Sequence, residues 1–360
     1  MCIREKTYII KYITKLILEE IIEMKKVKLS DVAQKAGVSV ATVTRVIHKN
    51  GYVAREKQEL VEKVVAELGY VPSQKSTIKR TNSIGIVLSA NNDHPFYHKI
   101  TYSLCECANR NGMFSIPVVA DVTNATLPDI VKVLLGKDIC GIIITAFEDS
   151  VMSRDVQEFL LKCGVPVVIV ERAGCYGLNR VLVDTVEGIY LVTEYLIRLG
   201  HRNLVYITPT PTGDVEQDRV RGFENALHAA EIPVKKEMVI IRPSWSTQDG
   251  YIGMKQALLQ NSNVTGVVTW SDTYAAGALQ YLLSIGKMVP KEISIVGYDD
   301  IYAPHLAPPL TSVENPINEM VQSAIGIIVK NRNSDTENAA RTVTLSPRLV
   351  IRQSSGKPSN

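Results

Sequence analysis

Residues 31–46 read DVAQKAGVSVATVTRV and predict two short helices joined by a tight turn. Gly37 permits the sharp change of direction between them, because glycine adopts backbone conformations that other residues avoid. Ser39 is a favourable residue at the start of the second helix. The apolar side chains of that helix recur at the spacing of a single helical face, which predicts that this face packs inward. They are Val43, Val46 and Ile47.

The opposite face of the second helix is predicted to be small, polar and basic. Its outward residues are Val40, Ala41, Thr42, Thr44 and Arg45. A short, flat surface of this kind fits the major groove of DNA, where a guanidinium bonds guanine and small apolar groups contact thymine methyls. Ser39, Thr42 and Thr44 are suited to phosphate oxygens. The alternative interpretation is a helical adaptor that touches no DNA.

A third helix is expected at about residues 55–68, where apolar residues would close a three-helix core. They are Leu60, Val61, Val64, Val65 and Leu68. Residues 24–82 carry 12 Lys and Arg against 5 Asp and Glu, although the chain of 360 residues has a formal net charge of only +3. A basic module attached to a mildly acidic body indicates a polyanionic partner for the first part alone.

The helix-turn-helix run continues into Glu67-Leu68-Gly69-Tyr70-Val71-Pro72. Together they closely resemble the headpiece of the lac repressor (LacI/GalR) family of bacterial transcription regulators. The resemblance implies a repressor that binds double-stranded DNA as a homodimer, so that its two-fold symmetry matches a pseudo-palindromic operator. We therefore expect a headpiece at residues 24–71.

Residues 72–82 are polar and basic and are expected to form a hinge linker. In the family this segment carries a short helix that wedges a leucine into the minor groove. The usual Ala-Arg-x-Leu is missing here, and the segment is shorter than in the family. Ile78 is the one apolar residue suited to such a wedge, and the alternative is that it leads into the next strand without touching DNA.

From residue 83 onward, short apolar runs alternate with helical patterns. Strands are expected at residues 84–88, 114–119, 141–145, 167–170, 204–207, 267–269 and 293–298, and helices at residues 97–110, 186–199, 219–229 and 273–283. Apolar strands with helical crossovers predict parallel sheets covered on both faces, and two such sheets fit the length. Ligands of these sheets bind at the carboxyl ends of the strands.

The resemblance extends over this body through several motifs. They are Ile84-Gly85-Ile86-Val87, His94-Pro95-Phe96-Tyr97, Gly141-Ile142-Ile143-Ile144, Leu199-Gly200-His201-Arg202, Arg219-x-x-Gly222-Phe223, Val296-Gly297-Tyr298-Asp299-Asp300 and Pro309-Leu310-Thr311-Ser312-Val313. The motifs resemble the family's effector-binding core, which is similar to periplasmic sugar-binding proteins. This implies an α/β class with a ligand between two lobes, lobe one at about residues 83–183 and 313–332 and lobe two at about 184–312. A C-terminal segment at 333–352 and a tail at 353–360 would follow.

Residues placed after strand ends, or by the resemblance, form the candidate effector site. They are Ser89, Phe96, Thr145, Glu171, Arg219, Trp245, Ser271, Asp272 and Asp299. Carboxylates accept hydrogen bonds from hydroxyls, a guanidinium donates them, and the rings of Trp245 and Phe96 offer flat faces to a sugar. A sugar is therefore the favoured effector, and a nucleobase or nucleoside is the alternative.

The identity of the ligand stays open at this point. Glu171 replaces the usual aspartate, and Thr185 stands where an Asp-Asn pair is commoner in the family. Strand-end polar residues such as Ser89, Thr145 and Glu171 often only satisfy the backbone or pair with one another.

Other classes of protein are disfavoured. An enzyme is not expected, nor a cofactor or a metal, because the chain has no Ser/His/Asp order, Gly-rich phosphate loop or metal-ligand cluster. The six cysteines form no CxxC pair and are expected to be free thiols in a reducing cytoplasm. Residues 1–23 are too charged for a membrane span and lack the apolar core of a secretory signal, which argues against a transport protein. They are either an N-terminal extension or precede a translation start at Met24, which we prefer.

Overall fold

The computed structural model describes residues 29–47, 53–68, 82–90, 94–145, 147, 149–332 and 339–359. The chain divides into two compact units, Met1–Lys79 and Arg80–Asn360. The expected N-terminal extension and the wedge residue Ile78 lie outside the described residues.

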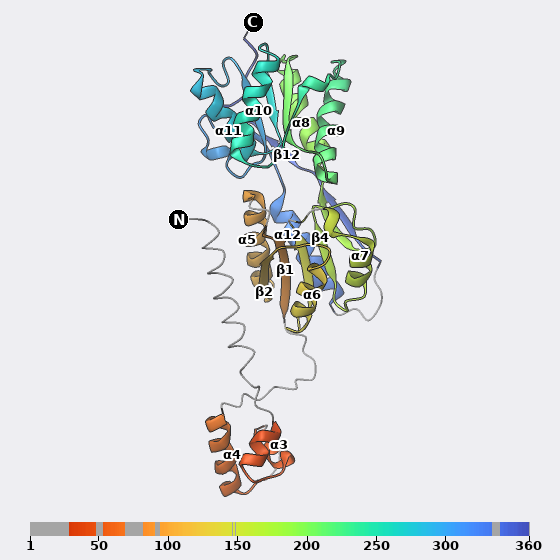
Figure 1. Ribbon diagram of the computed structural model, residues 1–360, viewed down its shortest axis with the longest axis vertical. Coiled ribbons are helices and arrows are strands. Elements are labelled where there is room, and N and C mark those ends of the chain that lie inside the picture. Colours follow the sequence, from red (N-terminus) through yellow and green to blue (C-terminus); the bar gives the residue numbers. More distant parts are fainter. Residues whose placement is uncertain are drawn as a thin grey trace. The chain divides into compact units, whose positions relative to one another are not determined.

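The first unit contains three helices, α2 (Leu29–Lys35), α3 (Val40–Ile47) and α4 (Arg55–Leu68) (Figure 1). Small apolar side chains from all three form its core. The buried ones are Val32, Ala33, Ala36, Val43, Val46, Val61 and Val64. Gly37 makes the turn with φ 63°, a conformation that favours glycine.

The prediction that Leu60 belongs to this core is wrong, because its side chain is 44% exposed. The inward stripe of α4 is formed by Val61, Val64, Val65 and Leu68. At roughly 100° per residue, Leu60 lies about 90° around the helix from the centre of that stripe.

The second unit contains two six-stranded sheets, as the alternation of strands and helices predicted. The first has the order β11-β5-β4-β3-β1-β2 and is parallel throughout. Its strands are β1 (Ser83–Ser89), β2 (Phe114–Ala120), β3 (Gly141–Thr145), β4 (Val167–Val170), β5 (Asn179–Val183) and β11 (Thr342–Leu345).

The second sheet has the order β12-β10-β9-β8-β6-β7, and only β12 runs antiparallel to its neighbour. Its strands are β6 (Leu204–Pro209), β7 (Val239–Arg242), β8 (Gly266–Thr269), β9 (Ser294–Asp299), β10 (Thr311–Glu314) and β12 (Arg348–Val350). We refer to the two sheets with their helices as lobe one and lobe two.

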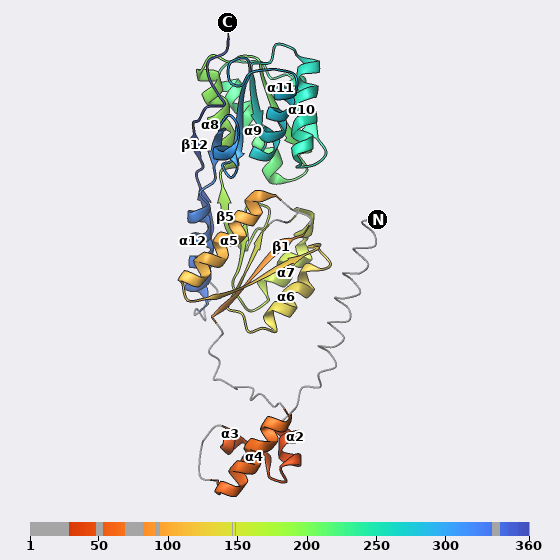
Figure 2. The ribbon, with the colours of Figure 1, turned by 90° about the vertical axis from the view of Figure 1, so that its left-hand side faces the viewer.

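Helices cover both faces of each sheet. In lobe one, α5 (Pro95–Arg110) and α12 (Ile317–Asn331) lie side by side on one face, and α6 (Leu127–Leu135) and α7 (Arg154–Leu161) pack on the other (Figures 1 and 2). In lobe two, α8 (Thr185–Arg198) and α9 (Asp214–Ala229) cover one face, and α10 (Thr247–Gln260) and α11 (Asp272–Ser284) the other. Short 3-10 turns are η1 (Asp149–Val151), η2 (Lys236–Met238) and η3 (Ala303–His305).

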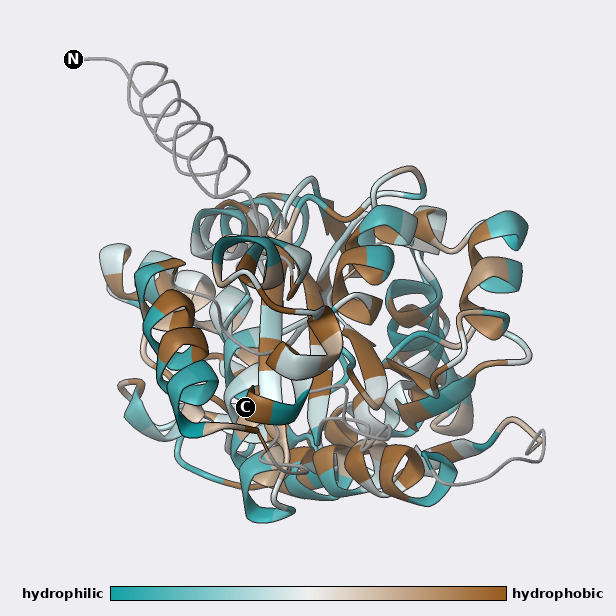
Figure 3. Cartoon of the chain, turned by 90° about the horizontal axis from the view of Figure 1, so that it is seen from below, coloured by the Kyte–Doolittle hydropathy of each residue, from teal (hydrophilic) through white to brown (hydrophobic). Residues whose placement is uncertain are grey.

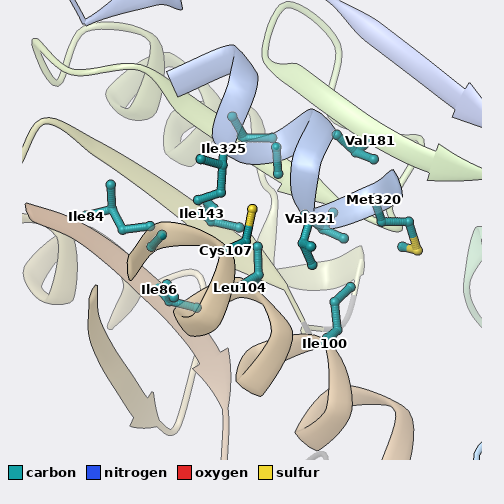
Figure 4. Close-up of a cluster of buried hydrophobic side chains, with 14 of the residues drawn as sticks. Ile84, Ile86, Ile100, Leu104, Cys107, Ile143, Val181, Met320, Val321 and Ile325 are labelled. Carbon is teal, nitrogen blue, oxygen red and sulfur yellow. The ribbon is translucent and has the colours of Figure 1, made fainter. Parts of the chain in front are cut away.

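The cores follow from the two-residue period of the strands. Ile84 and Ile86 of β1 point to α5 and α12, where they meet Leu104 and Val321 (Figure 4). Val87, the next residue along β1, belongs to the core on the opposite face. Figure 3 shows the same pattern at larger scale, with apolar residues gathered on the strands and on one side of the helices.

The chain crosses between the lobes three times. The first crossing follows β5, the second follows β10 and the third lies between β11 and β12. The expected boundary at residue 313 moves to a position after Glu314, because all of β10 pairs with β9 in lobe two.

The last residues are also more than a tail, because Ser354 is fully buried in lobe two. Its hydroxyl accepts from the Thr311 amide at 2.8 Å and donates to the Ile295 carbonyl at 2.6 Å.

Candidate functional site

The outward face of α3 is the first candidate surface. Ala41, Thr44 and Arg45 are exposed, Val40 is 47% exposed and Thr42 is partly covered. The Ser39 hydroxyl caps the helix by accepting from the Thr42 amide at 3.2 Å. The Thr44 hydroxyl donates to the Val40 carbonyl at 2.9 Å. These bonds use the hydroxyls locally, and the surface keeps one exposed guanidinium among small side chains.

The second candidate site lies where lobe one meets lobe two, and two of its carboxylates have unusual backbone conformations. Glu171 directly follows β4 with φ 74°, and Asp299 ends β9 with φ 95°. Residues other than glycine rarely adopt positive φ, and such strain concentrates at functional sites. The sequence located both residues at strand ends but gave no sign of their backbone geometry.

Arg219 is the buried centre of this site, with 2% exposure. The sequence predicted that Arg219 begins its helix. Because α9 begins at Asp214, Arg219 lies inside the helix instead. Its Nη1 donates to the Trp270 carbonyl at 2.5 Å, and its Nη2 lies 3.7 Å from Asp299 Oδ1. The guanidinium carbon is 3.8 Å from the ring centre of Tyr298 and 4.6 Å from that of Trp270. A counter-ion and two aromatic faces thus stabilise a charge that would otherwise be costly to bury.

Aromatic rings extend the site along lobe two. Trp245, in the loop between β7 and α10, stacks on Trp270 with ring centres 6.5 Å apart. His94 of lobe one approaches Trp270 edge-on at 5.6 Å. Sequence reasoning selected Trp245 but missed Trp270 and His94, although Trp270 directly follows strand β8 and His94 precedes α5.

Polar contacts join the two lobes. His94 Nε2 lies 3.9 Å from Asp299 Oδ2, and burial lowers the pKa of His94 although the carboxylate opposes this. Arg172 Nη1 lies 3.4 Å from Asp214 Oδ1 and 3.7 Å from Glu216 Oε2. The lobes are therefore linked by polar groups that follow β4 and precede α5 on one side and that belong to α9 and β9 on the other.

Glu171 is a carboxyl group whose protonation changes near neutral pH. Burial raises its pKa to about 7, although Arg172 and Arg219 oppose the rise. Tyr97 forms a side-chain hydrogen bond with Glu171, and burial raises the pKa of this tyrosine as well.

A set of buried side-chain atoms around Arg219 makes no hydrogen bond within the described part of the chain. They are His94 Nε2, Glu171 Oε2, Glu216 Oε2, Arg219 Nε, Trp270 Nε1 and Tyr298 Oη. A buried polar group left without a partner costs about 1–3 kcal/mol. Such a concentration of donors and acceptors is the chemistry of a site for a small polar ligand.

Four of the predicted effector residues serve other contacts in the structure. Phe96 belongs to the apolar core of lobe one, and Ser271 caps α11 by accepting from the Tyr274 amide. The Asp272 carboxylate accepts from the amides of residues 301–303 and from the Ser312 hydroxyl at 2.6 Å. Ser89 lines a separate pocket with Asp121, Thr123 and Asn124. The structure thus brings Glu171, Arg219, Trp245 and Asp299 together, with Thr145 ending the neighbouring strand β3.

Within the described residues, no group of His, Cys, Asp and Glu side chains has the arrangement of a metal site. No described helix is long and apolar enough to span a bilayer.

Two families match the chain. Residues 28–73 match "Bacterial regulatory proteins, lacI family", and residues 193–355 match "Periplasmic binding protein-like domain". The Ribose operon repressor of Haemophilus influenzae is 30% identical over 91% of this chain and 98% of its own length.

Solved structures extend the likeness to three dimensions. The cellobiose complex of the transcriptional regulator CelR has 27% identity and a TM-score of 0.68, covering 91% of this chain and 99% of that one. The Lac repressor dimer bound to operator and the anti-inducer ONPF has a TM-score of 0.69 at 24% identity, over 92% of this chain and 100% of that one. This last likeness supports the fold.

Proposed function

Because the chain belongs to the LacI family of bacterial DNA-binding repressors, we propose that a sugar-like effector bound between its two lobes sets its affinity for an operator. The protein is a regulator of transcription and not an enzyme, as its relatives are repressors. The effector and its residues are the part that we propose.

The observation that carries the proposal is the set of unpartnered buried polar atoms around Arg219. A ligand with several hydroxyls would satisfy both the unpartnered donors and the unpartnered acceptors, because a hydroxyl both donates and accepts hydrogen bonds. Asp299 and Glu171 would accept, Arg219 Nε and Trp270 Nε1 would donate, and the Trp245–Trp270 stack would lie against a sugar ring. The cellobiose bound to the similar regulator CelR is consistent with this class of effector.

For DNA, we assign base contacts to Arg45 with Val40 and Ala41, and phosphate contacts to Ser39, Thr42 and Thr44. The exposed fractions of the side chains on α3 support this assignment. We further propose a homodimer reading a pseudo-palindromic operator, because two headpieces related by a two-fold axis present the same helix to both half-sites.

The effector would act by a population shift. His94 and Arg172 of lobe one contact Asp299, Asp214 and Glu216 of lobe two, so a ligand between them changes the relative stability of lobe arrangements. An effector that prefers one arrangement changes operator affinity, and the operator changes effector affinity by the same factor.

The experiment has two steps. Selection from random duplex DNA with the full chain should yield a pseudo-palindrome, and gel-shift titration should then show that a sugar changes the affinity for it. Failure to select any sequence would contradict the assignment of α3. Operator binding that no ligand of the protein alters would contradict control by an effector.

A further inference from the structure

The start of α9, next to the site, is occupied by the chain's own acids. A helix N-terminus has free amides and a positive dipole end, which make it a natural place for a phosphate or carboxylate. Here Asp214 accepts from the amides of Val215 and Ala173, each at 2.7 Å, and Glu216 follows in the same turn. An anionic ligand would have to displace or approach these carboxylates.

Other helices of the second unit also begin with a capping side chain or with a proline. Asp184 caps α8 by accepting from the Glu187 amide at 2.9 Å, and Ser246 and Ser271 cap α10 and α11. At α5, Pro95 takes a first-turn position that needs no amide hydrogen. At α8, α10 and α11, one first-turn amide is therefore already bound by a side chain of the protein itself.

The balance of fixed charge in the site is acidic. Among described residues, three carboxylates, one carboxyl group with a pKa of about 7 and two guanidinium groups belong to the cluster around Arg219, and both arginines are already ion-paired. The carboxylates are Asp214, Glu216 and Asp299, the carboxyl group is Glu171, and the guanidinium groups are Arg172 and Arg219. In a site of low dielectric, this balance disfavours a further negative charge strongly.

A pocket beside Glu171 repeats this balance and is lined by both lobes. Its acidic side chains are Glu171, Asp184, Glu187, Asp214 and Asp218, and its basic side chain is Arg221. Burial and the neighbouring Asp214 and Asp184 raise the pKa of Asp218, against the effect of Arg221. The surroundings of the site therefore have an excess of negative charge, as its interior does.

We infer that the effector is an uncharged polyhydroxylated molecule and that the site excludes phosphorylated and carboxylated sugars. The inference rests on the proposed function and narrows it. The unpartnered hydroxyl, indole and carboxylate atoms supply hydrogen bonds to neutral hydroxyls, whereas the start of α9 is occupied by Asp214 and the charges of both arginines are already balanced by carboxylates.

The test is calorimetric titration of the full chain with matched pairs of ligands: ribose and ribose 5-phosphate, glucose and glucose 6-phosphate, and cellobiose and cellobiose phosphate. At least one neutral sugar is expected to bind, with its phosphorylated partner weaker by about tenfold or more. A phosphorylated sugar that binds as tightly as its neutral partner would overturn the inference. So would a panel in which no neutral sugar binds.

A charge variant tests the cause. Glu216→Gln removes one carboxylate beside Arg172, while Asp214 still pairs with that arginine. The ratio of the affinity for the neutral sugar to that for its phosphorylated partner should therefore shrink about fivefold or more. Glu224→Gln, eight residues further along α9, is the matched control and should leave the difference unchanged. An unchanged difference in Glu216→Gln would overturn the inference.

Gel shifts with the same ligands separate this inference from the proposed function. A neutral sugar that binds but leaves operator affinity unchanged contradicts effector control and supports the charge selectivity. A phosphorylated sugar that binds and alters operator affinity supports effector control and overturns the charge selectivity.

Discussion

Replacing Glu171 with glutamine should change how the stability of the protein depends on pH. The carboxyl group is buried near Tyr97 and Arg219, and burial raises its pKa from an ordinary 4.5 to about 7. Glutamine has nearly the same shape, and the backbone strain of φ 74° is the same for either side chain. The substitution therefore removes the ionisation and little else.

The sign follows from proton binding. Between about pH 4.5 and pH 7 the folded protein keeps the proton on Glu171 that the unfolded chain has released. Stability consequently falls as the pH rises through this window. This shift of the Glu171 pKa corresponds to a change in the free energy of unfolding of about 3 kcal/mol at most. Because part of the residue is exposed to solvent, which screens the charge, we expect roughly 1–3 kcal/mol.

The assay is thermal unfolding of wild type and Glu171→Gln at pH 5 and pH 8. The two proteins should melt alike at pH 5, and the variant should melt roughly 2–8 °C higher at pH 8. Glu158→Gln, on the exposed surface of α7, is the control and should follow wild type at both pH values. If the melting temperatures of wild type and Glu171→Gln differ by the same amount at pH 5 and at pH 8, the reasoning is refuted.

Three further predictions concern other parts of the chain. Arg45→Ala should weaken operator binding in gel shifts by about 10–100-fold with the headpiece still folded, since Arg45 is exposed, and unchanged binding would contradict its role. Asp299→Asn leaves Arg219 buried without its counter-ion, so denaturant unfolding should show a loss of about 3–5 kcal/mol and calorimetry no effector binding. A Cβ at Gly277 would lie 1.9 Å from the Thr247 carbonyl oxygen. A Cβ at Gly326 would have no neighbouring atom within 4 Å. Gly277→Ala should therefore cost about 1–3 kcal/mol or more and Gly326→Ala should add about 0.5–1 kcal/mol, and equal melting temperatures would contradict this.

Much of the fold could be predicted from local patterns. The strand expected at residues 141–145 is β3 (Gly141–Thr145), because five consecutive apolar or small residues suit a strand buried on both faces. The inward face of α3 follows in the same way from the spacing of Val43 and Val46. Leu60 shows the limit, since a residue at the margin of a helical stripe is buried or exposed according to what packs beside it.

The sequence predicted several residues of the ligand site from their positions at strand ends, but it did not predict which side chains contact one another. Glu171 and Asp299 were selected because polar residues after parallel strands gather at one edge of a sheet, and Arg219 because of the family resemblance. Asp272 met the same criterion but is engaged by the amides of residues 301–303. Trp270 was missed because a tryptophan after an apolar strand has the same local pattern whether it lines a core or a site.

The sequence by itself determined the helix-turn-helix unit and the two parallel sheets, because both depend on residues close together in the chain. Turn glycine, helix cap and apolar period all act within a few residues. The tertiary structure alone decided which strand-end groups meet across the lobes. Arg219 and Asp299 are 80 positions apart, and His94 lies on the other lobe. Their distances, burial and shared charge exist only once both sheets have formed, so the acidic balance that selects the effector is a property of the folded chain.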